Sequence, residues 1–148
     1  MSGVFVAATT AEVALSAATA KTVMQIVAPT NQRLRVRRYS VAFDGTSATA
    51  EPVQIRVLRQ TSAGTMTSLT PVKLSAGSET VQATAQHTAT AEPTAGDVLD
   101  AIEVHPQSGF DVVLPADMPL EVPGGGRLGI ECTAPATVNV RAKIWFEE

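Results

Sequence analysis

The sequence is poor in the residues that build disulfides, membrane spans and export signals. Its single cysteine, Cys132, excludes an intramolecular disulfide, and its apolar surroundings in GIECTA predict a small core residue. No apolar run approaches the roughly 18 residues of a membrane-spanning helix. The first 20 residues have Ala-x-Ala spacing but no basic start, and Glu12 interrupts them, so we do not expect a secretory signal peptide.

Patterns typical of catalysis and metal binding are also missing. The two histidines, His87 and His105, fall in no metal-ligand spacing, and Cys132 cannot complete a zinc site alone. The nucleophile motif G-x-S-x-G does not occur. We therefore expect no enzymatic activity, no cofactor, no metal site and no small-molecule substrate.

One cluster of carboxylates needs a separate interpretation. Asp97, Asp100 and Glu103 gather around the start of an expected strand. Paired carboxylates can hydrolyse glycosides, but six aromatic residues in the whole chain are a thin supply of sugar-stacking platforms. The cluster also lacks the D-x-D-x-D-G pattern of a calcium loop. We interpret it as a solvated acidic edge.

The residues that are abundant predict short strands joined by tight turns. The chain has 23 alanines and 18 threonines, with nine prolines and ten glycines, while charged residues make up only 17%. Residues 137–147 alternate apolar and polar side chains. One face carries Val138, Val140, Ala142, Ile144 and Phe146, and the other carries Asn139, Arg141, Lys143 and Trp145. Further strands are expected at 13–16, 22–28, 53–57, 66–74, 80–86, 99–104, 110–114 and 127–133.

The stretch RLRVRRYSVAF at 33–43 predicts a long strand with an irregularity. Leu34 and Val36 fall on even positions, whereas Tyr39 and Val41 fall on odd ones. A bulge near Arg37–Arg38 would bring both sets to the same face.

Helix signals are weak. Thr9-x-x-Glu12 has the form of a helix capping box, but we favour a strand carrying Val13 and Leu15, within a hairpin that spans 13–29. Eight to ten short strands separated by turn residues indicate an all-β chain, a single antiparallel sandwich or barrel over residues 1–148.

The segment VPGGGRLG at 122–129 matches the dinucleotide-binding pattern G-x-G-x-x-G. That site needs a strand before the glycines and a helix after them. Pro119 and Pro123 interrupt the preceding residues, and LGIECTA resembles a strand. We interpret the segment as a glycine turn that leads into a late strand.

Charge is distributed unevenly along the chain. Residues 1–60 sum to +4 and residues 61–148 to −7, which together give the net charge of −3 and predict two electrostatic poles. Strand alternation would place Arg33, Arg35 and Arg37 on one face, with Arg38 displaced by the bulge. Phosphate binding is one interpretation, but we favour a solvated face or an interface with an acidic neighbour, because the chain is acidic and poor in aromatics.

Three segments together resemble a known group of proteins. FDGTSATAEPVQIRVLRQTSAGT, TAQHTATAEPTAGDV and VPGGGRLGI are similar to small proteins encoded among the virion genes of tailed bacteriophages, from about Val23 to Glu148. The resemblance implies a jelly-roll-like β-sandwich that decorates or cements the head shell, located on the virion and made in the host cytoplasm. It implies contact with the major capsid protein and self-association as a homotrimer, with a dimer as the alternative. It assigns no functional residue.

The expected function is therefore a virion structural protein that binds neither nucleic acid nor membrane. The alternative is a fibre, head or tail module that binds a host glycan. Candidate contacts to the capsid or to another subunit are Val4, Phe5, Val6, Arg33, Arg35, Arg37 and Arg38. Residues 1–9 form either an arm that docks on a neighbouring subunit or an ordinary first strand.

Overall fold

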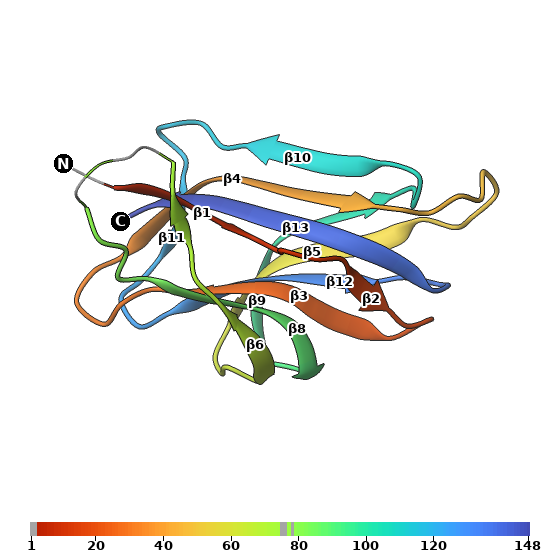
Figure 1. The fold of residues 1–148 in the computed structure, drawn as a ribbon, viewed down its shortest axis with the longest axis horizontal. Coiled ribbons are helices and arrows are strands. Elements are labelled where there is room, and N and C mark those ends of the chain that lie inside the picture. Colours follow the sequence, from red (N-terminus) through yellow and green to blue (C-terminus); the bar gives the residue numbers. More distant parts are fainter. Residues whose placement is uncertain (1–2, 75–76, 78) are drawn as a thin grey trace.

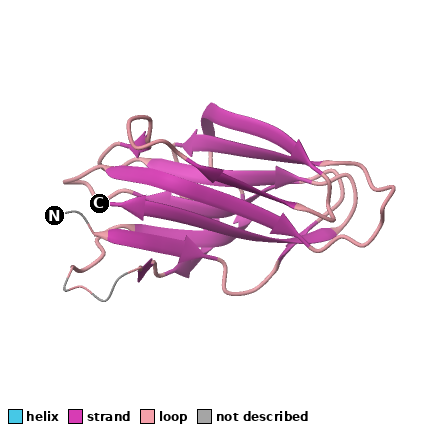
Figure 2. Cartoon of the chain, turned by 90° about the horizontal axis from the view of Figure 1, so that it is seen from above, coloured by secondary structure: helices cyan, strands magenta, loops and turns pink. Residues whose placement is uncertain are grey.

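The computed structural model describes residues 3–74, 77 and 79–148, a part of the chain that folds as strands and loops (Figure 2). The strands are β1 (Val4–Ala8), β2 (Val13–Leu15), β3 (Ala20–Val27), β4 (Leu34–Phe43), β5 (Val53–Gln60), β6 (Thr65–Leu69), β7 (Val72–Lys73), β8 (Thr84–Ala91), β9 (Ala95–Val104), β10 (Gly109–Val113), β11 (Leu120–Val122), β12 (Arg127–Thr133) and β13 (Val138–Glu147).

The strands form two sheets packed face to face (Figure 1). Sheet I has the order β10-β4-β13-β1-β7, with β11 also pairing with β4 and β2 with β13. Sheet II has the order β6-β8-β3-β12-β5-β9. The named strands pair antiparallel throughout, which confirms the predicted antiparallel β-sandwich.

The connectivity is that of a jelly roll. Strands counted forward from the N-terminus pair with strands counted back from the C-terminus: β1 with β13, β3 with β12, β4 with β10, and β5 with β9. This nested pairing is a long hairpin rolled up so that its layers face each other. Strands β6, β7 and β8 are inserted between β5 and β9, and they extend the edges of both sheets.

The core between the sheets follows from the alternation of the sequence. Along β13, Val140, Ala142, Ile144 and Phe146 are at most 1% exposed, which confirms the face predicted for this strand. The Phe146 ring lies 5.8 Å from the Phe5 ring of β1, measured between centroids. Cys132 is also fully buried, and burial raises the pKa of its thiol to about 12, as expected for an inert core residue.

The predicted irregularity in β4 is present at Arg37. Trp145 of β13 pairs with Arg38, whereas the next residue, Phe146, pairs with Val36. Arg37 is therefore the extra residue of a bulge, and Val36 and Tyr39 both point into the core.

The prediction of a hairpin over residues 13–29 is wrong. A strand is present at Val13–Leu15, as favoured over the helix, but β2 pairs with β13 in sheet I, while β3 lies in sheet II. Both strands bury their apolar residues in the same core from opposite layers, which a hairpin within one sheet would not allow. Ala18, with a positive φ of 54°, lies in the connection between them.

Several boundaries also differ from the predictions. The strand expected at 66–74 is two strands, β6 and β7, which belong to different sheets and are separated by Thr70 and Pro71. The strand expected at 80–86 begins at Thr84 and continues to Ala91, and β9 begins four residues earlier than predicted. Strand β11 was not predicted, because three residues between two prolines carry no periodic signal.

The segment VPGGGRLG is a turn between β11 and β12, as predicted. Gly126 N donates to Pro123 O at 2.8 Å, and Gly125 has a φ of +77°, which favours glycine. The strand β12 follows, so the strand–turn–helix unit of a dinucleotide site is not formed by these residues.

The outer face of sheet II carries a network of side-chain amides, of which Gln25 and Gln60 are buried and Gln86 is partly buried. Gln25 Nε2 donates to Gln60 Oε1 at 2.6 Å, Gln60 Nε2 donates to Thr22 Oγ1 at 2.9 Å, and Gln86 Nε2 donates to Gln25 Oε1 at 2.6 Å. The segment after β5 covers this network, because backbone carbonyls of Ser62 and Ala63 accept further bonds from Gln25 and Gln86.

Candidate functional site

The outer face of sheet I carries a row of side chains that crosses five strands in register. The row consists of Val72 of β7, Val6 of β1, Trp145 of β13, Arg38 of β4 and Val113 of β10. We call it the Trp145 row. The neighbours of Val6 and Trp145 along their strands are buried, so alternation turns the row outward. Val72 and Val113, at its two ends, are 59% and 71% exposed.

A stacked pair forms the centre of the row. The guanidinium carbon of Arg38 lies 4.4 Å from the centroid of the Trp145 ring, and Lys143 Nζ lies 5.9 Å from a ring centroid of the same indole. Arg38 Nε donates to Asp111 Oδ1 at 2.8 Å, and Arg38 Nη2 donates to the second oxygen. These bonds hold the pKa of Asp111 below its usual value. The guanidinium is therefore held in place over the indole.

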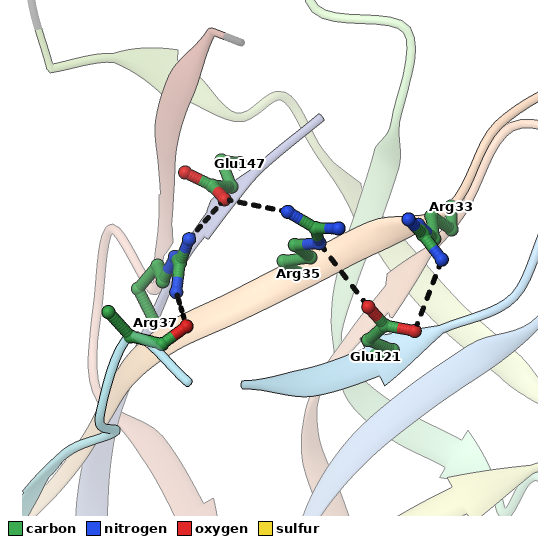
Figure 3. A network of polar contacts seen from close by, with 6 residues as sticks. Arg33, Arg35, Arg37, Glu121 and Glu147 are labelled. Atoms are coloured by element: carbon green, nitrogen blue, oxygen red, sulfur yellow. Dashed lines mark hydrogen bonds and ion pairs between the residues drawn. The ribbon is translucent and has the colours of Figure 1, made fainter. Parts of the chain in front are cut away.

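Three arginines next to the row share two carboxylates of the same chain, as Figure 3 shows. Glu121 of β11 accepts hydrogen bonds from Arg33 at 3.5 Å and from Arg35 at 3.3 Å. Glu147 of β13 lies 2.5 Å from Arg37 Nη2 and 3.9 Å from Arg35 Nη1. Three guanidinium groups and two carboxylates leave one net positive charge in this ladder.

The two electrostatic poles predicted from the sequence are not formed by these strands. Each ion pair among the described residues joins a basic residue of the first 60 to an acidic residue of the remainder. The reason is topological. Four of the five paired arginines lie on or just before β4, which lies between β13 on one side and β10 and β11 on the other, and Arg56 of β5 lies opposite Glu131 of β12. The acidic half of the sequence therefore lies against the basic strand.

The structure brings most of the predicted contact residues to one face. Val4 and Val6 of β1 lie on the outer side of sheet I with Arg33, Arg35, Arg37 and Arg38, separated by β13. Phe5 is the exception. It is 1% exposed and packs on Phe146, so its assignment as a surface contact is wrong, because alternation turns it into the core.

The N-terminal segment is an ordinary first strand in this structure. Residues Val4–Ala8 pair with β13 over five positions and with β7 over two. Gly3 N donates to Glu148 O at 3.2 Å, and Glu148 N donates to Gly3 O at 3.1 Å, so pairing extends to the last residue. Of the two alternatives for residues 1–9, the described residues 3–9 match the strand, and residues 1–2 lie outside the described part.

Several residues of the face were missed as contacts. The alternation of β13 already placed Trp145 with Arg141 and Lys143 on the polar side, which was a usable signal. The sequence carries no such signal for Val72 and Val113, because their exposure depends on their position at sheet edges. Two further exposed apolar side chains, Leu74 and Val4, lie near Val72. They are neighbours, because Leu74 N donates to Val4 O at 3.1 Å.

The carboxylates of β9 do not converge on one site. Asp97 and Glu103 are exposed, which fits a solvated edge. Asp100 differs from that prediction, because it is partly buried and accepts a hydrogen bond from the hydroxyl of Tyr39, on the opposite sheet. Burial, and secondarily this bond, raises the pKa of Tyr39.

Alkaline pH should therefore destabilise the fold through Tyr39. The raised folded-state pKa gives a stabilising contribution that is complete below the pKa of an unfolded tyrosine, about 10, and is lost as pH rises above it. Because Tyr39 is the only tyrosine, the ultraviolet absorbance of tyrosinate reports on it alone. We expect tyrosinate to appear only together with unfolding. Titration of the still-folded protein near pH 10 would contradict this, and Tyr39→Phe should abolish the signal.

An open pocket lies at one end of the sandwich and has a volume of about 510 Å³. It is lined by residues of the 44–53 loop, Pro106 and the 135–139 turn, and none of its lining residues is aromatic. Asp44 accepts hydrogen bonds from the backbone and side chain of Asn139, which lower the pKa of its carboxyl group. This carboxylate therefore fastens the loop at the rim.

Neither histidine is among the residues that line this pocket. His105 Nδ1 accepts from Gln107 N at 3.1 Å in a turn, and His87 Nδ1 lies 2.8 Å from Thr88 Oγ1. In the described residues, no three His, Cys, Asp or Glu side chains are grouped closely enough to hold a metal ion. The described part of the chain has no helix with the length and apolarity needed to cross a membrane.

Searches against protein-family models, curated proteins and solved structures found no match to this chain.

Proposed function

We propose that this protein is a structural component of a tailed-bacteriophage particle that decorates the head shell, and that it docks through the outer face of sheet I. The resemblance of the three segments quoted above supports a place in the phage particle, with the major capsid protein as the partner. The observation that carries the docking face is the Trp145 row, in which an indole stacked under an arginine is flanked by exposed valines.

The composition of this face suits a protein contact. Tryptophan and arginine are the residues most enriched at energetic hot spots, and a surrounding apolar rim excludes water from them. A decoration protein also needs only modest affinity for each site. Repeated contacts over a shell, and links between copies, raise the overall avidity.

The first test is the copy number in purified particles, measured by quantitative mass spectrometry against the major capsid protein. Decoration predicts a number of the same order as that of the capsid subunits. A handful of copies per particle would place the protein at the portal, tail or fibre and favour the glycan-binding alternative. Its absence from particles would overturn the virion role.

The second test addresses the face itself. Trp145→Ala should weaken binding to shells stripped of the protein by about tenfold or more, as expected for loss of a hot-spot residue. Val98→Ala is a matched control, since Val98 is an exposed apolar residue on β9 of sheet II. Equal binding by both variants, with unchanged thermal unfolding, would exclude the Trp145 row as the docking surface.

A further inference from the structure

The free edges of the two sheets are not equally protected. An edge strand exposes unpaired N–H and C=O groups and can add a strand from another chain, unless it is short, bulged or charged. Sheet I ends at β10 and β7, with the three-residue strands β11 and β2 as further short edges, and sheet II ends at β6 and β9. Each of these edges can be judged from its residues.

Three edges are poorly suited to pairing. Strand β7 has two residues. Strand β6 pairs irregularly with β8 between Thr65 and Thr67 and carries mainly hydroxyl side chains. Strand β9 pairs with β5 through two irregularities, and the inward position of Asp100 places a charged group at its edge. Inward charges and bulges are common protections against edge pairing.

Strand β10 has neither a bulge nor an inward-pointing charge. Its five residues pair with β4 at five consecutive positions without irregularity. Phe43 N donates to Ser108 O and Leu114 N donates to Arg37 O, so the residues at even positions bond to β4. Because bonding alternates along an antiparallel strand, Gly109, Asp111 and Val113 present their backbone groups to the free side.

The side chains around this edge also favour association. Val113 and Met118 are 71% and 69% exposed, the two highest values among large apolar side chains of the described residues, and Met118 lies in the turn that follows β10. Asp111 is already paired with Arg38, so an approaching strand meets a compensated carboxylate. In Figure 1, β10 lies at the border of the sheet with no strand beyond it.

We propose that β10 pairs antiparallel with β10 of a second copy of this chain, about a two-fold axis at Val112, and joins the two copies of sheet I into one continuous sheet. Antiparallel pairing uses only backbone N–H and C=O groups, so the free edge of β10 can pair with the same edge of a second copy related by a two-fold axis. In this register Asp111 faces Val113 of the second copy, and Phe110 faces Leu114. An axis at Asp111 would instead oppose two carboxylates, which is destabilising.

The proposed dimer can be tested independently of the role on the head shell, since the test uses the purified chain alone. Sedimentation equilibrium of the wild type should give twice the chain mass of 15.4 kDa, with dissociation on dilution. Val113→Pro removes an N–H on the free side without removing a bond to β4, and it should raise the dimer dissociation constant about tenfold or more. A monomeric or trimeric wild type would overturn the proposal, because this edge closes after two copies.

Matched variants separate edge pairing from misfolding. Val113→Glu should also dissociate the dimer, because in this register it opposes Asp111 of the second copy with a like charge, whereas Val72→Glu, an outward position at the opposite edge of sheet I, should leave it intact. Dissociation by both glutamate variants or by neither, with unchanged thermal unfolding, would overturn the assignment to β10.

The register has its own test. Val112→Cys should form a disulfide-linked dimer on oxidation, because the two residues face each other across the axis as a closely spaced pair and the native Cys132 is buried. Val98→Cys is the control, and it should remain monomeric on a denaturing gel without reductant. Absence of a covalent Val112→Cys dimer would overturn the register.

Discussion

Replacing Phe5 by alanine should lower the free energy of unfolding by about 3–5 kcal/mol. The ring is 1% exposed and packs against Phe146 near the end of β13, so its removal leaves a cavity between the two sheets. The loss should appear in denaturant unfolding as a lower midpoint with little change in slope. It should also be the same at all protein concentrations, because the contact lies within one chain.

Val6→Ala provides the control on the same strand. Val6 lies on the outer face of sheet I, so its truncation should cost much less than that of Phe5. An unchanged stability for Phe5→Ala would mean that the segment leaves its own sandwich in solution. Deletion of residues 1–9 should likewise prevent folding, and a deleted protein that folds and assembles normally would contradict the strand.

Introducing a methyl group at Gly129 should destabilise the protein by about 1–3 kcal/mol. A Cβ built at Gly129 lies 2.3 Å from Gln60 Oε1 and 2.5 Å from Gln60 Cδ. The Gln60 amide cannot move aside without cost, since it bonds both Gln25 and Thr22 in the buried network on sheet II. Gly129→Ala should therefore break hydrogen bonds within this buried network.

A double-mutant cycle checks this cause. With Gln60→Ala in place, Gly129→Ala should become neutral or stabilising, because alanine suits a strand better than glycine once the clash is gone. The free energies of unfolding of the four proteins give the coupling between the two positions. An equal cost of Gly129→Ala in both backgrounds would rule out the clash with Gln60.

The features predicted correctly from the sequence are those encoded locally. The alternation in β13 fixes its buried face, and the change of parity between Val36 and Tyr39 located the bulge at Arg37. The glycine turn before β12 was identified because prolines and a strand-like continuation surround it. In each case, the residues that decide the structure are neighbours in the chain.

The features that were missed depend on contacts between distant segments. Glu121 pairs with arginines that lie 86 and 88 residues away, and Glu147 pairs with Arg37 at a separation of 110 residues. Only the strand order brings these residues together. The hairpin expected at 13–29 failed for the same reason: both strands have apolar alternation, and nothing local states which layer each joins. The exposure of Val113 likewise follows from its place at a sheet edge.

The nested pairing of the jelly roll has a consequence for synthesis on the ribosome. Strand β13 occupies the middle of sheet I and pairs with β4, β1 and β2, so this sheet cannot assemble before residues 138–147 emerge. Nearly every partner is far away in the chain, and such high contact order slows folding. The nascent chain therefore cannot complete sheet I until β13 has been synthesised. Until then, apolar strands of this sheet are accessible to chaperones.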